Sequence, residues 1–223
     1  MVRRDTKSLI SAAAAELFIE RGYEKTTLRM IAQRIGISHV SILGHFASKR
    51  EIASQTMQGY LNGLLAKCNE LLPTIEASAE VNADCCFHML LWNLHFKILA
   101  DNPGFRRYYI SYLSSEPILL QDRETSLAEM DTEAWRIVLP KRDAFITSTV
   151  MTAVDVNFAK LIDAGVTDSV LAATIVFQLA MMLGYYPDYQ LQEEDLRSFA
   201  ERYLTDVRVD LLHEFYLTGA AEV

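Results

Sequence analysis

The sequence predicts an all-α protein, because no long stretch alternates β-branched and polar residues as a half-buried strand would. The 223 residues include only nine glycines and five prolines, so few positions would interrupt long helices. Hydrophobic residues make up 51% of the chain and charged residues 22%. This balance is typical of a globular protein with a large core rather than of a disordered chain.

Three short helices are expected at the N-terminus. The first covers residues 5–21 and ends at Gly22, a residue that suits a helix C-terminus. The second begins with Thr27 as its N-cap and ends at Gly36. The third is very short and begins with Ser38 as its cap. Because only a tight turn separates the second helix from the third, this pattern is that of a helix-turn-helix.

A fourth helix is expected to begin at Ser48, with Glu51 completing a capping box three residues later. It should end near Leu72, before Pro73. At roughly 1.5 Å per residue such a helix would be about 37 Å long. It could therefore leave a small N-terminal domain and enter the rest of the protein.

Charge divides the chain at the same place. Residues 1–52 contain nine Lys and Arg residues against five acids, which gives this segment a net charge of +4. The whole chain carries −8, so residues 53–223 carry −12. A basic N-terminal domain on an acidic body suggests that only the small domain meets a polyanion. We therefore predict two domains, residues 1–52 and 53–223, with no flexible linker between them.

The second domain is expected to be helical as well, with helices over residues 80–101, 104–115, 125–138, 141–164, 168–186 and 193–218. The most apolar run, residues 170–186, is slightly short for a bilayer span and holds Gln178 at its centre. We expect a buried or interface helix there rather than a membrane segment. Because no secretory signal is visible either, a cytoplasmic protein is expected.

The stretch ISHVSILGHFASKRE, residues 37–51, contains two histidines but is not expected to bind a metal. His39 and His45 are six residues apart, which separates them by about 240° around a helix. The residues between them are mostly small, as suits a helix that enters the major groove of DNA. Taken alone, the pattern also fits a small structural helix in an α-domain.

Residues 23–52, YEKTTLRMIAQRIGISHVSILGHFASKREI, resemble the N-terminal DNA-binding domain of the tetracycline-repressor (TetR) family. The matching positions are Tyr23, Thr26-Thr27, Ile31-Ala32, Gly36-Ile37-Ser38, His45-Phe46, Ser48-Lys49 and Glu51. The preceding AAAAELFIERGY is similar to the first helix of the family. The resemblance implies a three-helix DNA-binding domain followed by a larger helical domain for ligand binding and dimerisation.

The resemblance also implies roles for single residues. Thr27 would bind a phosphate, Arg29 would reach a guanine or a phosphate, and Lys49 would clamp the DNA backbone. The residues facing the major groove would be His39, Val40, Ser41 and Gly44. His45 would contact a phosphate or, equally well, pack in a half-buried position.

Two positions depart from the family pattern. The family usually has glycine where this chain has Val40, and tyrosine where it has Leu43. The tyrosine hydroxyl normally contacts a phosphate, which Leu43 cannot do. Val40 and Leu43 could instead touch thymine methyl groups. Gly44 weakens the helix by roughly 1 kcal/mol relative to alanine but would permit a close approach of the backbone.

The last two predicted helices, residues 168–186 and 193–218, are candidates for a homodimer interface. One short recognition helix buries too little surface for useful specificity, so a partner subunit is expected. The final helix carries Leu196, Phe199, Tyr203, Val207, Leu211 and Phe215 at helical spacing. In the family, the corresponding helices of two subunits form a four-helix bundle. Periodicity alone would fit the core of a monomer equally well.

The middle helices suggest a chamber for a small apolar or aromatic effector. His88, Trp92 and His95 fall on one stripe of a helix. His88 and His95 lie about 10.5 Å apart along the axis, which is too far for one metal ion to bridge. The candidate ligand-binding residues are His88, Trp92, His95, Tyr108, Tyr112, Phe145, Thr149, Phe177 and Met181. Such a stripe is more often core, and that alternative stays open.

The sequence shows no catalytic, cofactor or metal signature. It has no glycine-rich phosphate loop, no GxSxG and no HExxH. Cys68, Cys85 and Cys86 are odd in number and lack CxxC spacing, which argues for a reducing compartment and against structural zinc. We expect neither an enzyme nor a bound cofactor or metal.

Together these features predict a dimeric, ligand-responsive transcriptional regulator, most simply a repressor. Two recognition helices would read the half-sites of a palindromic operator in double-stranded DNA, and a small effector would release them. The alternative is a helical small-molecule-binding or sequestering protein whose DNA-binding head has diverged. The changes at Val40 and Leu43 motivate that alternative.

Overall fold

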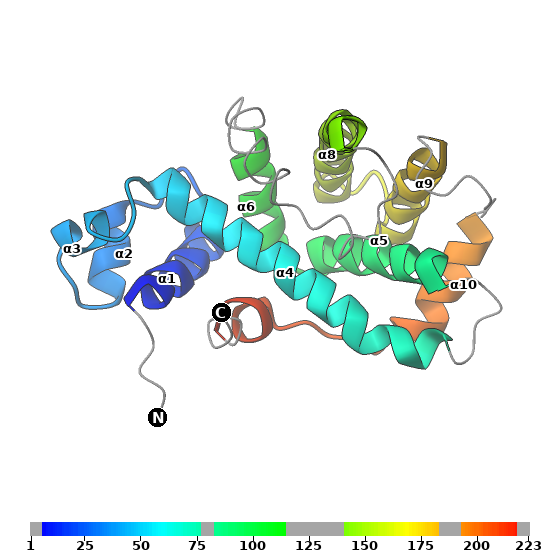
Figure 1. The fold of residues 1–223 in the computed structure, drawn as a ribbon, viewed down its shortest axis with the longest axis horizontal. Helices are drawn as coiled ribbons and strands as arrows, with labels where there is room; N and C mark the ends of the chain where they lie inside the picture. The colour runs from blue at the N-terminus through cyan, green and yellow to red at the C-terminus, as the bar shows by residue number, and fades with distance from the viewer. Residues whose placement is uncertain (1–5, 77–82, 115–140, 183–192, 218–223) are drawn as a thin grey trace.

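The computed structural model describes residues 6–76, 83–114, 141–182 and 193–217, and every regular element in these ranges is a helix (Figure 1). The predicted all-α fold is therefore confirmed. Three short helices form a head at one end, a long helix leads out of it, and the other helices form a larger body (Figure 1). Within the described ranges, no helix has both the length and the hydrophobicity needed to cross a membrane.

The head contains α1 (Thr6–Arg21), α2 (Leu28–Arg34) and α3 (His39–Leu43). Gly22 follows α1 with a φ of 85°, a left-handed conformation that glycine adopts without steric cost. The face of α1 with Ile10, Leu17 and Phe18 is buried, as its spacing predicts. The head therefore has the three helices expected from the sequence.

The long helix α4 (Lys49–Glu76) connects the head to the body without interruption. The prediction that it ends before Pro73 was wrong, because the helix continues through this proline. Proline removes one backbone hydrogen bond here. Leu72 and Ile75 beside it are only 4% and 2% exposed, so their burial offsets that loss. The 28 residues of α4 span about 42 Å.

The body contains α5 (Ala83–Asp101), α6 (Pro103–Ser114), α8 (Lys141–Asp163), α9 (Ser169–Met182), α10 (Glu193–Tyr203) and the π-helix η1 (Leu211–Leu217). The helix predicted over residues 125–138 lies outside the described residues. The prediction of one helix over residues 193–218 was wrong, because residues 207–210 have no regular structure. Val207 and Val209 are β-branched and alternate with polar residues there, which disfavours a helix.

One continuous hydrophobic core joins the head to the body. α5 lies in the middle of the body and packs against α4 and α9 (Figure 1). In the head, α1 packs against α4, α6 and η1. The head is therefore held by packing against two body elements, α6 and η1, in addition to its packing on α4 and its covalent connection through that helix.

Candidate DNA-binding surface

Short-range hydrogen bonds build the unit formed by α2, the turn and α3. The Thr27 side chain accepts a hydrogen bond from the Met30 amide at 3.3 Å. Ser38 caps α3 by accepting one from the Ser41 amide at 3.0 Å. Between the helices, Gly36 has a φ of 70°, which lets the chain turn at low steric cost. The predicted helix-turn-helix is present.

One side of α3 is anchored in the core of the head. Ile42 is fully buried, and Phe46 just after the helix is 2% exposed. Lys7 of α1 covers the Phe46 ring, with its Nζ 5.3 Å from the ring centroid. These contacts orient α3 so that its opposite side faces solvent.

The outward side of α3 is largely apolar. Val40 is 75% exposed and Leu43 is 47% exposed. His45 is also exposed, whereas His39 is half-buried. An exposed valine and leucine on a five-residue helix are costly in water, so this surface is suited to a partner that covers it.

The two small residues of this surface, Ser41 and Gly44, differ in how far the fold constrains them. The Ser41 hydroxyl lies 2.7 Å from the Ser38 hydroxyl, so it already takes part in the cap of α3. Gly44 has an ordinary helical φ of −74°, and an added Cβ would lie 3.4 Å from the Ser41 carbonyl oxygen. The fold does not require glycine at position 44, which is compatible with the predicted close approach to DNA.

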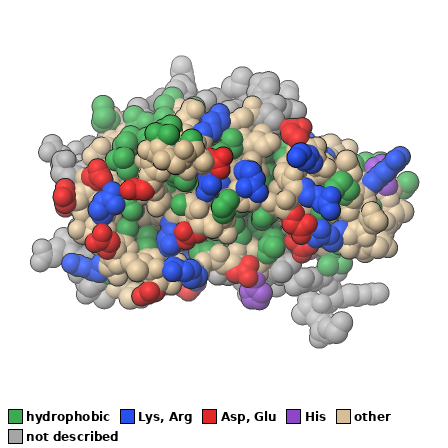
Figure 2. All heavy atoms as spheres, turned by 180° about the vertical axis from the view of Figure 1, so that it is seen from behind, with side chains coloured by type: hydrophobic (Ala, Val, Ile, Leu, Met, Phe, Trp, Pro, Cys, Tyr) green, Lys and Arg blue, Asp and Glu red, His purple; other side chains and the backbone are tan. Residues whose placement is uncertain are grey.

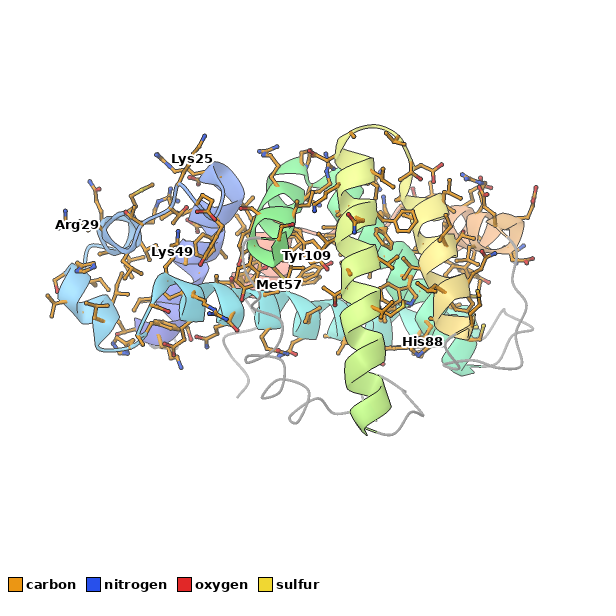
Figure 3. The ribbon with its side chains drawn as sticks, turned by 90° about the horizontal axis from the view of Figure 1, so that it is seen from above. Lys25, Arg29, Lys49, Met57, His88 and Tyr109 are labelled. Atoms are coloured by element: carbon orange, nitrogen blue, oxygen red, sulfur yellow. The ribbon has the colours of Figure 1, made fainter. Side chains whose placement is uncertain are left out.

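The side chains of Arg29 and Lys25 in the head point into solvent (Figure 3). Neither makes a hydrogen bond or ion pair with another residue of the described chain. The Thr27 residue between them in sequence is exposed as well. Arg34, by contrast, bonds two glutamates of α1 at 2.7 Å each. Lys25 was not among the predicted contacts, because the sequence does not show which cations are already paired.

Lys49 has a role in the fold of the head. Its Nζ donates to the Tyr23 carbonyl oxygen at 2.9 Å and lies 4.2 Å from the Tyr23 ring centroid. Partial burial lowers the pKa of the Lys49 ammonium, and the nearby Glu24 carboxylate opposes this shift. The start of α4 is thereby tied to the turn after α1. Replacing Lys49 would disturb this tie as well as any phosphate contact.

In the body, a chain of buried polar groups joins four helices. The Tyr60 hydroxyl lies 2.6 Å from His95 Nδ1, and His95 Nε2 lies 3.0 Å from an Asp155 oxygen. The Tyr109 hydroxyl donates to the other oxygen of Asp155. These groups come from α4, α5, α8 and α6. His95, predicted to bind a ligand, is therefore also a cross-link between helices.

Two other predicted ligand residues lie where the head meets the body. The Tyr108 ring stacks on Phe18 of α1 with centroids 4.9 Å apart, and its hydroxyl lies 2.7 Å from that of Thr56. The Tyr112 ring meets the Tyr23 ring at 5.5 Å. Both tyrosines therefore contact the head directly.

The remaining predicted ligand-binding residues lie in the body, away from the contact between head and body. His88 and Phe177 are buried, and Trp92 is half-buried. In Figure 3, His88 lies well away from the head. The Trp92 indole N–H and the Asn93 side-chain oxygen are buried without hydrogen-bond partners among the described residues. The side chains of the other candidates lie outside the described atoms: Phe145, Thr149 and Met181.

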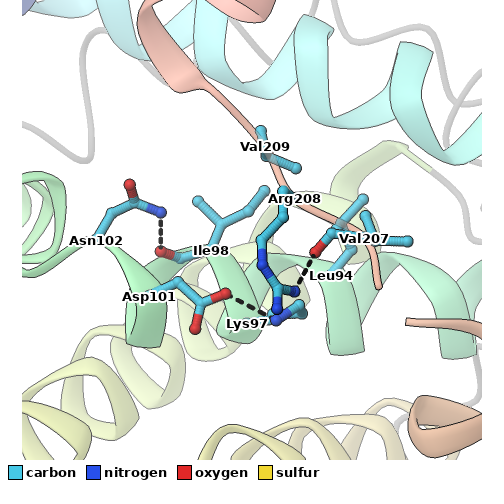
Figure 4. Close-up of a pocket in the computed structure, with 8 residues that line it drawn as sticks. All are labelled: Leu94, Lys97, Ile98, Asp101, Asn102, Val207, Arg208 and Val209. Atoms are coloured by element: carbon cyan, nitrogen blue, oxygen red, sulfur yellow. Dashed lines mark hydrogen bonds and ion pairs between the residues drawn. The ribbon is translucent and has the colours of Figure 1, made fainter. Parts of the chain in front are cut away.

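A cavity of about 180 Å³ opens between α5 and residues 207–209 (Figure 4). None of the predicted ligand residues lines it. Lys97 there is paired with Asp101 at 2.7 Å, and Arg208 donates to backbone carbonyls. The cavity is smaller than the roughly 300 Å³ at which small-molecule sites begin. It is a poor match to the predicted effector chamber.

The described residues were compared with the needs of a metal site and of a reactive thiol. No cluster of three or more His, Cys, Asp or Glu among them could hold a metal ion. The three cysteines are buried and form no disulfide. Burial raises the pKa of the Cys68 and Cys85 thiols to about 12, so they are poor nucleophiles.

Comparison with known proteins agrees with the geometry of the head. Residues 10–56 match the family described as bacterial regulatory proteins, tetR family. Over these residues the chain is similar to the tetR family. This match covers most of α1, all of α2 and α3, and the first turns of α4.

Two curated relatives extend the tetR-family similarity into the body. The repressor KstR2 of Rhodococcus jostii is 41% identical over 121 residues, which cover 54% of this chain and 55% of the relative. The activator FasR of Mycolicibacterium smegmatis is 31% identical over 122 residues, which cover 52% and 50%. The chain thus matches about half the length of these relatives. Both are named as transcriptional regulators and neither as an enzyme.

One solved structure shares its fold with most of the chain. SmeT, the repressor of the Stenotrophomonas maltophilia multidrug efflux pump SmeDEF, superposes with a TM-score of 0.50. It is 19% identical, and the match covers 84% of this chain and 96% of SmeT. This similarity extends the shared fold from the head to the body.

Proposed function

We propose that this protein is a DNA-binding transcriptional regulator whose α3 enters the major groove. The observation that carries the proposal is the orientation of α3, with Ile42 and Phe46 in the core while Val40 and Leu43 face solvent. The Arg29 side chain, which is unpaired among the described residues, lies on α2 next to α3, where it could reach a DNA phosphate. The similarity of the head to named transcriptional regulators supports the same function.

The proposed DNA contacts fall into two classes. Base edges would be met by His39, Val40, Ser41, Leu43 and Gly44, and the phosphate backbone by Thr27, Arg29, His45 and Lys49. Val40 and Leu43 favour sites with thymine, because their side chains can pack on its methyl group. We add Lys25 to the proposed phosphate contacts, because it is exposed and unpaired within the described chain.

The regulator is proposed to act as a homodimer through the outer face of α8 and α9. This replaces residues 193–218 as half of the interface, because Leu196, Phe199 and Phe215 are buried within their own chain. α8 and α9 instead expose apolar side chains at helical spacing: Val150, Leu161, Ile175 and Met182. Hydrophobic side chains gather over this part of the body in Figure 2. Two such helix pairs would bury this face in a four-helix bundle.

Ile175→Glu tests this interface, with Leu9→Glu on the head as the matched control. Ile175 is 38% exposed and Leu9 is 37% exposed, so both charges are tolerated in a monomer. Sedimentation should give a dimer for the wild type and for Leu9→Glu, and a monomer for Ile175→Glu. An unchanged dimer in Ile175→Glu would remove α9 from the interface.

A small apolar or aromatic effector is proposed to bind in the body near Trp92. The Trp92 indole N–H and the Asn93 oxygen are buried without partners among the described residues, and such groups are normally satisfied. An effector can release the dimer from a palindromic operator only if it binds the DNA-incompetent state more tightly. We propose repression as the sign of regulation, since KstR2 is named a repressor, although FasR is named an activator.

Binding to the DNA upstream of the protein's own gene tests the proposed function. A sequence-specific complex should form, and its affinity should fall steeply with salt, because bound phosphates release their counterions. Arg29→Ala should weaken binding to all sequences or at one guanine position, whereas Val40→Ala should change the preference for thymine. No specific complex, or an affinity independent of salt, would contradict the proposal.

The second candidate function is a small-molecule-binding protein with a diverged head. The apolar face of α3, with Val40 and Leu43 exposed, favours it, because that face lacks the usual phosphate-binding tyrosine. A compound screen by thermal shift would identify an effector under either function. Release of specific DNA by the same compound separates the regulator from the sequestering protein.

A further inference from the structure

The C-terminal segment of the chain returns to the junction between head and body. After α10 ends at Tyr203, the chain runs past α5, where Val207 and Val209 line the cavity of Figure 4. η1 then lies beside the middle of α4 and packs against both α4 and α1 (Figure 1). A segment from the far end of the sequence thus contacts the first helix of the head.

α4 has a seat for this segment, formed by Gly59 and Gly63. The two glycines are four residues apart and therefore lie on one face of the helix. A Cβ on Gly63 would lie only 2.5 Å from the Phe215 ring, whereas a Cβ on Gly59 would lie 3.7 Å from the Tyr216 ring. Glycine destabilises a helix interior, so the close approach of Phe215 gives a physical reason for Gly63.

The seat is occupied and connected to the buried network of the body. Phe215 is 4% exposed and Tyr216 is 7% exposed. The Phe215 ring lies 5.7 Å from the ring of Tyr60, whose hydroxyl contacts His95. The Tyr216 hydroxyl, however, is buried without a hydrogen-bond partner among the described residues, which reduces the net stabilisation from docking. The segment is well packed but not optimised for permanent attachment.

We propose that η1 is a strap that fixes the orientation of the head on the body, with Phe215 and Gly63 as positioning residues for DNA binding. The strap touches α1 and α4 together, and after its release the main remaining contacts of α1 with described helices outside the head would be those with α4 and α6. The head could then adopt a wider range of orientations relative to the body. A smaller fraction of molecules would have the orientation that fits the operator. The DNA part of this proposal rests on the proposed function, whereas the effect on orientation does not.

Gly63→Ala in the full chain tests the strap, with Gly59→Ala as the matched control. Both changes favour the helical state of α4, so a weakened helix cannot explain a difference between them. Only the alanine at position 63 collides with the strap. In hydrogen exchange, peptides covering residues 211–217 should exchange faster in Gly63→Ala than in Gly59→Ala or wild type. Equal protection in all three proteins would overturn the proposed docking.

A distance measurement between head and body tests the effect on orientation without DNA. Spin labels would be placed by Gln33→Cys on α2 and Ser198→Cys on α10, both exposed positions outside the proposed dimer face, while the native cysteines are buried. The distance distribution should broaden in Gly63→Ala and stay narrow in Gly59→Ala. Faster exchange of η1 with an unchanged distribution would overturn the positioning role of the strap.

Operator affinity then tests the consequence for function. Gly63→Ala should weaken specific binding by about threefold to tenfold, the factor by which the competent fraction falls. Gly59→Ala should bind like the wild type. If the wild type binds no specific DNA, the proposed function fails, and the distance measurement still decides the strap. A broadened distribution with unchanged affinity would overturn its role in DNA binding.

Discussion

The helix caps of the head and the buried polar links of the body are hydrogen bonds that reach very different distances along the chain. In the head, the caps at Thr27, Ser38 and Ser48 each join residues three positions apart. In the body, the Tyr60–His95 and His95–Asp155 contacts join residues 35 and 60 positions apart. The head can therefore form its elements from local signals, whereas the body's polar links require helices that have already met.

The largest expected effect comes from Phe18→Ala, where the two regions meet. Phe18 is fully buried and stacks on Tyr108 of α6 with centroids 4.9 Å apart. Its replacement should lower the free energy of unfolding by about 3–5 kcal/mol. Urea denaturation followed by circular dichroism should still show one transition, because the ring supports both regions. A separate early transition of the head would show that head and body unfold independently.

Asp155→Asn tests the long-range links of the body alone. The carboxylate accepts hydrogen bonds from His95 and Tyr109 through different oxygens. An amide has only one acceptor oxygen, so one buried donor should lose its partner, at a cost of about 1–3 kcal/mol. Asp101→Asn is the control, because its exposed pair with Lys97 should contribute less than about 1 kcal/mol. An equal decrease in the free energy of unfolding in the two variants would contradict the stabilising role of the buried hydrogen bonds around Asp155.

Ser38→Ala tests the local links of the head. Loss of the cap on α3 should destabilise the protein by about 1 kcal/mol, and Ser38→Asp should retain most of the stability because aspartate also caps. Val40→Ala changes a side chain that is 75% exposed and should alter stability by less than about 0.5 kcal/mol. Urea denaturation of the three variants measures these differences. A larger loss in Val40→Ala than in Ser38→Ala would reverse the proposed orientation of α3.

The smallest effect is expected at a local cap within the body. Asp168 accepts a hydrogen bond from the Leu171 amide at 2.8 Å, and this bond lowers the carboxyl pKa below its ordinary value of 3.8. A lowered pKa stabilises the fold above the ordinary value, and this stabilisation is lost as the pH falls through the folded pKa. Asp168→Asn keeps a capping side chain without titration. Its melting temperature should therefore fall less than that of the wild type below pH 4.

The head was predictable because its determinants lie close together in the sequence. Thr27, Gly36 and Ser38 gave the turn and both caps, and the spacing of Ile42 and Phe46 gave the buried side of α3. The proline rule failed at Pro73, since burial of neighbouring residues outweighed a local preference. Local signals therefore give correct boundaries only where no tertiary contact opposes them.

The amino-acid pattern by itself determined the helical class, the helix-turn-helix and the outward position of Val40 and Leu43, because these depend on periodicity and caps within a few residues. It could not separate Arg29, which is unpaired among the described residues, from Arg34, which is paired with two glutamates, and it could not place Tyr108 against the head. It also could not bring Phe215 onto Gly63, which lies far away in the sequence. These outcomes depend on which helices pack together, and packing is decided by the summed burial of the whole core rather than by any short segment.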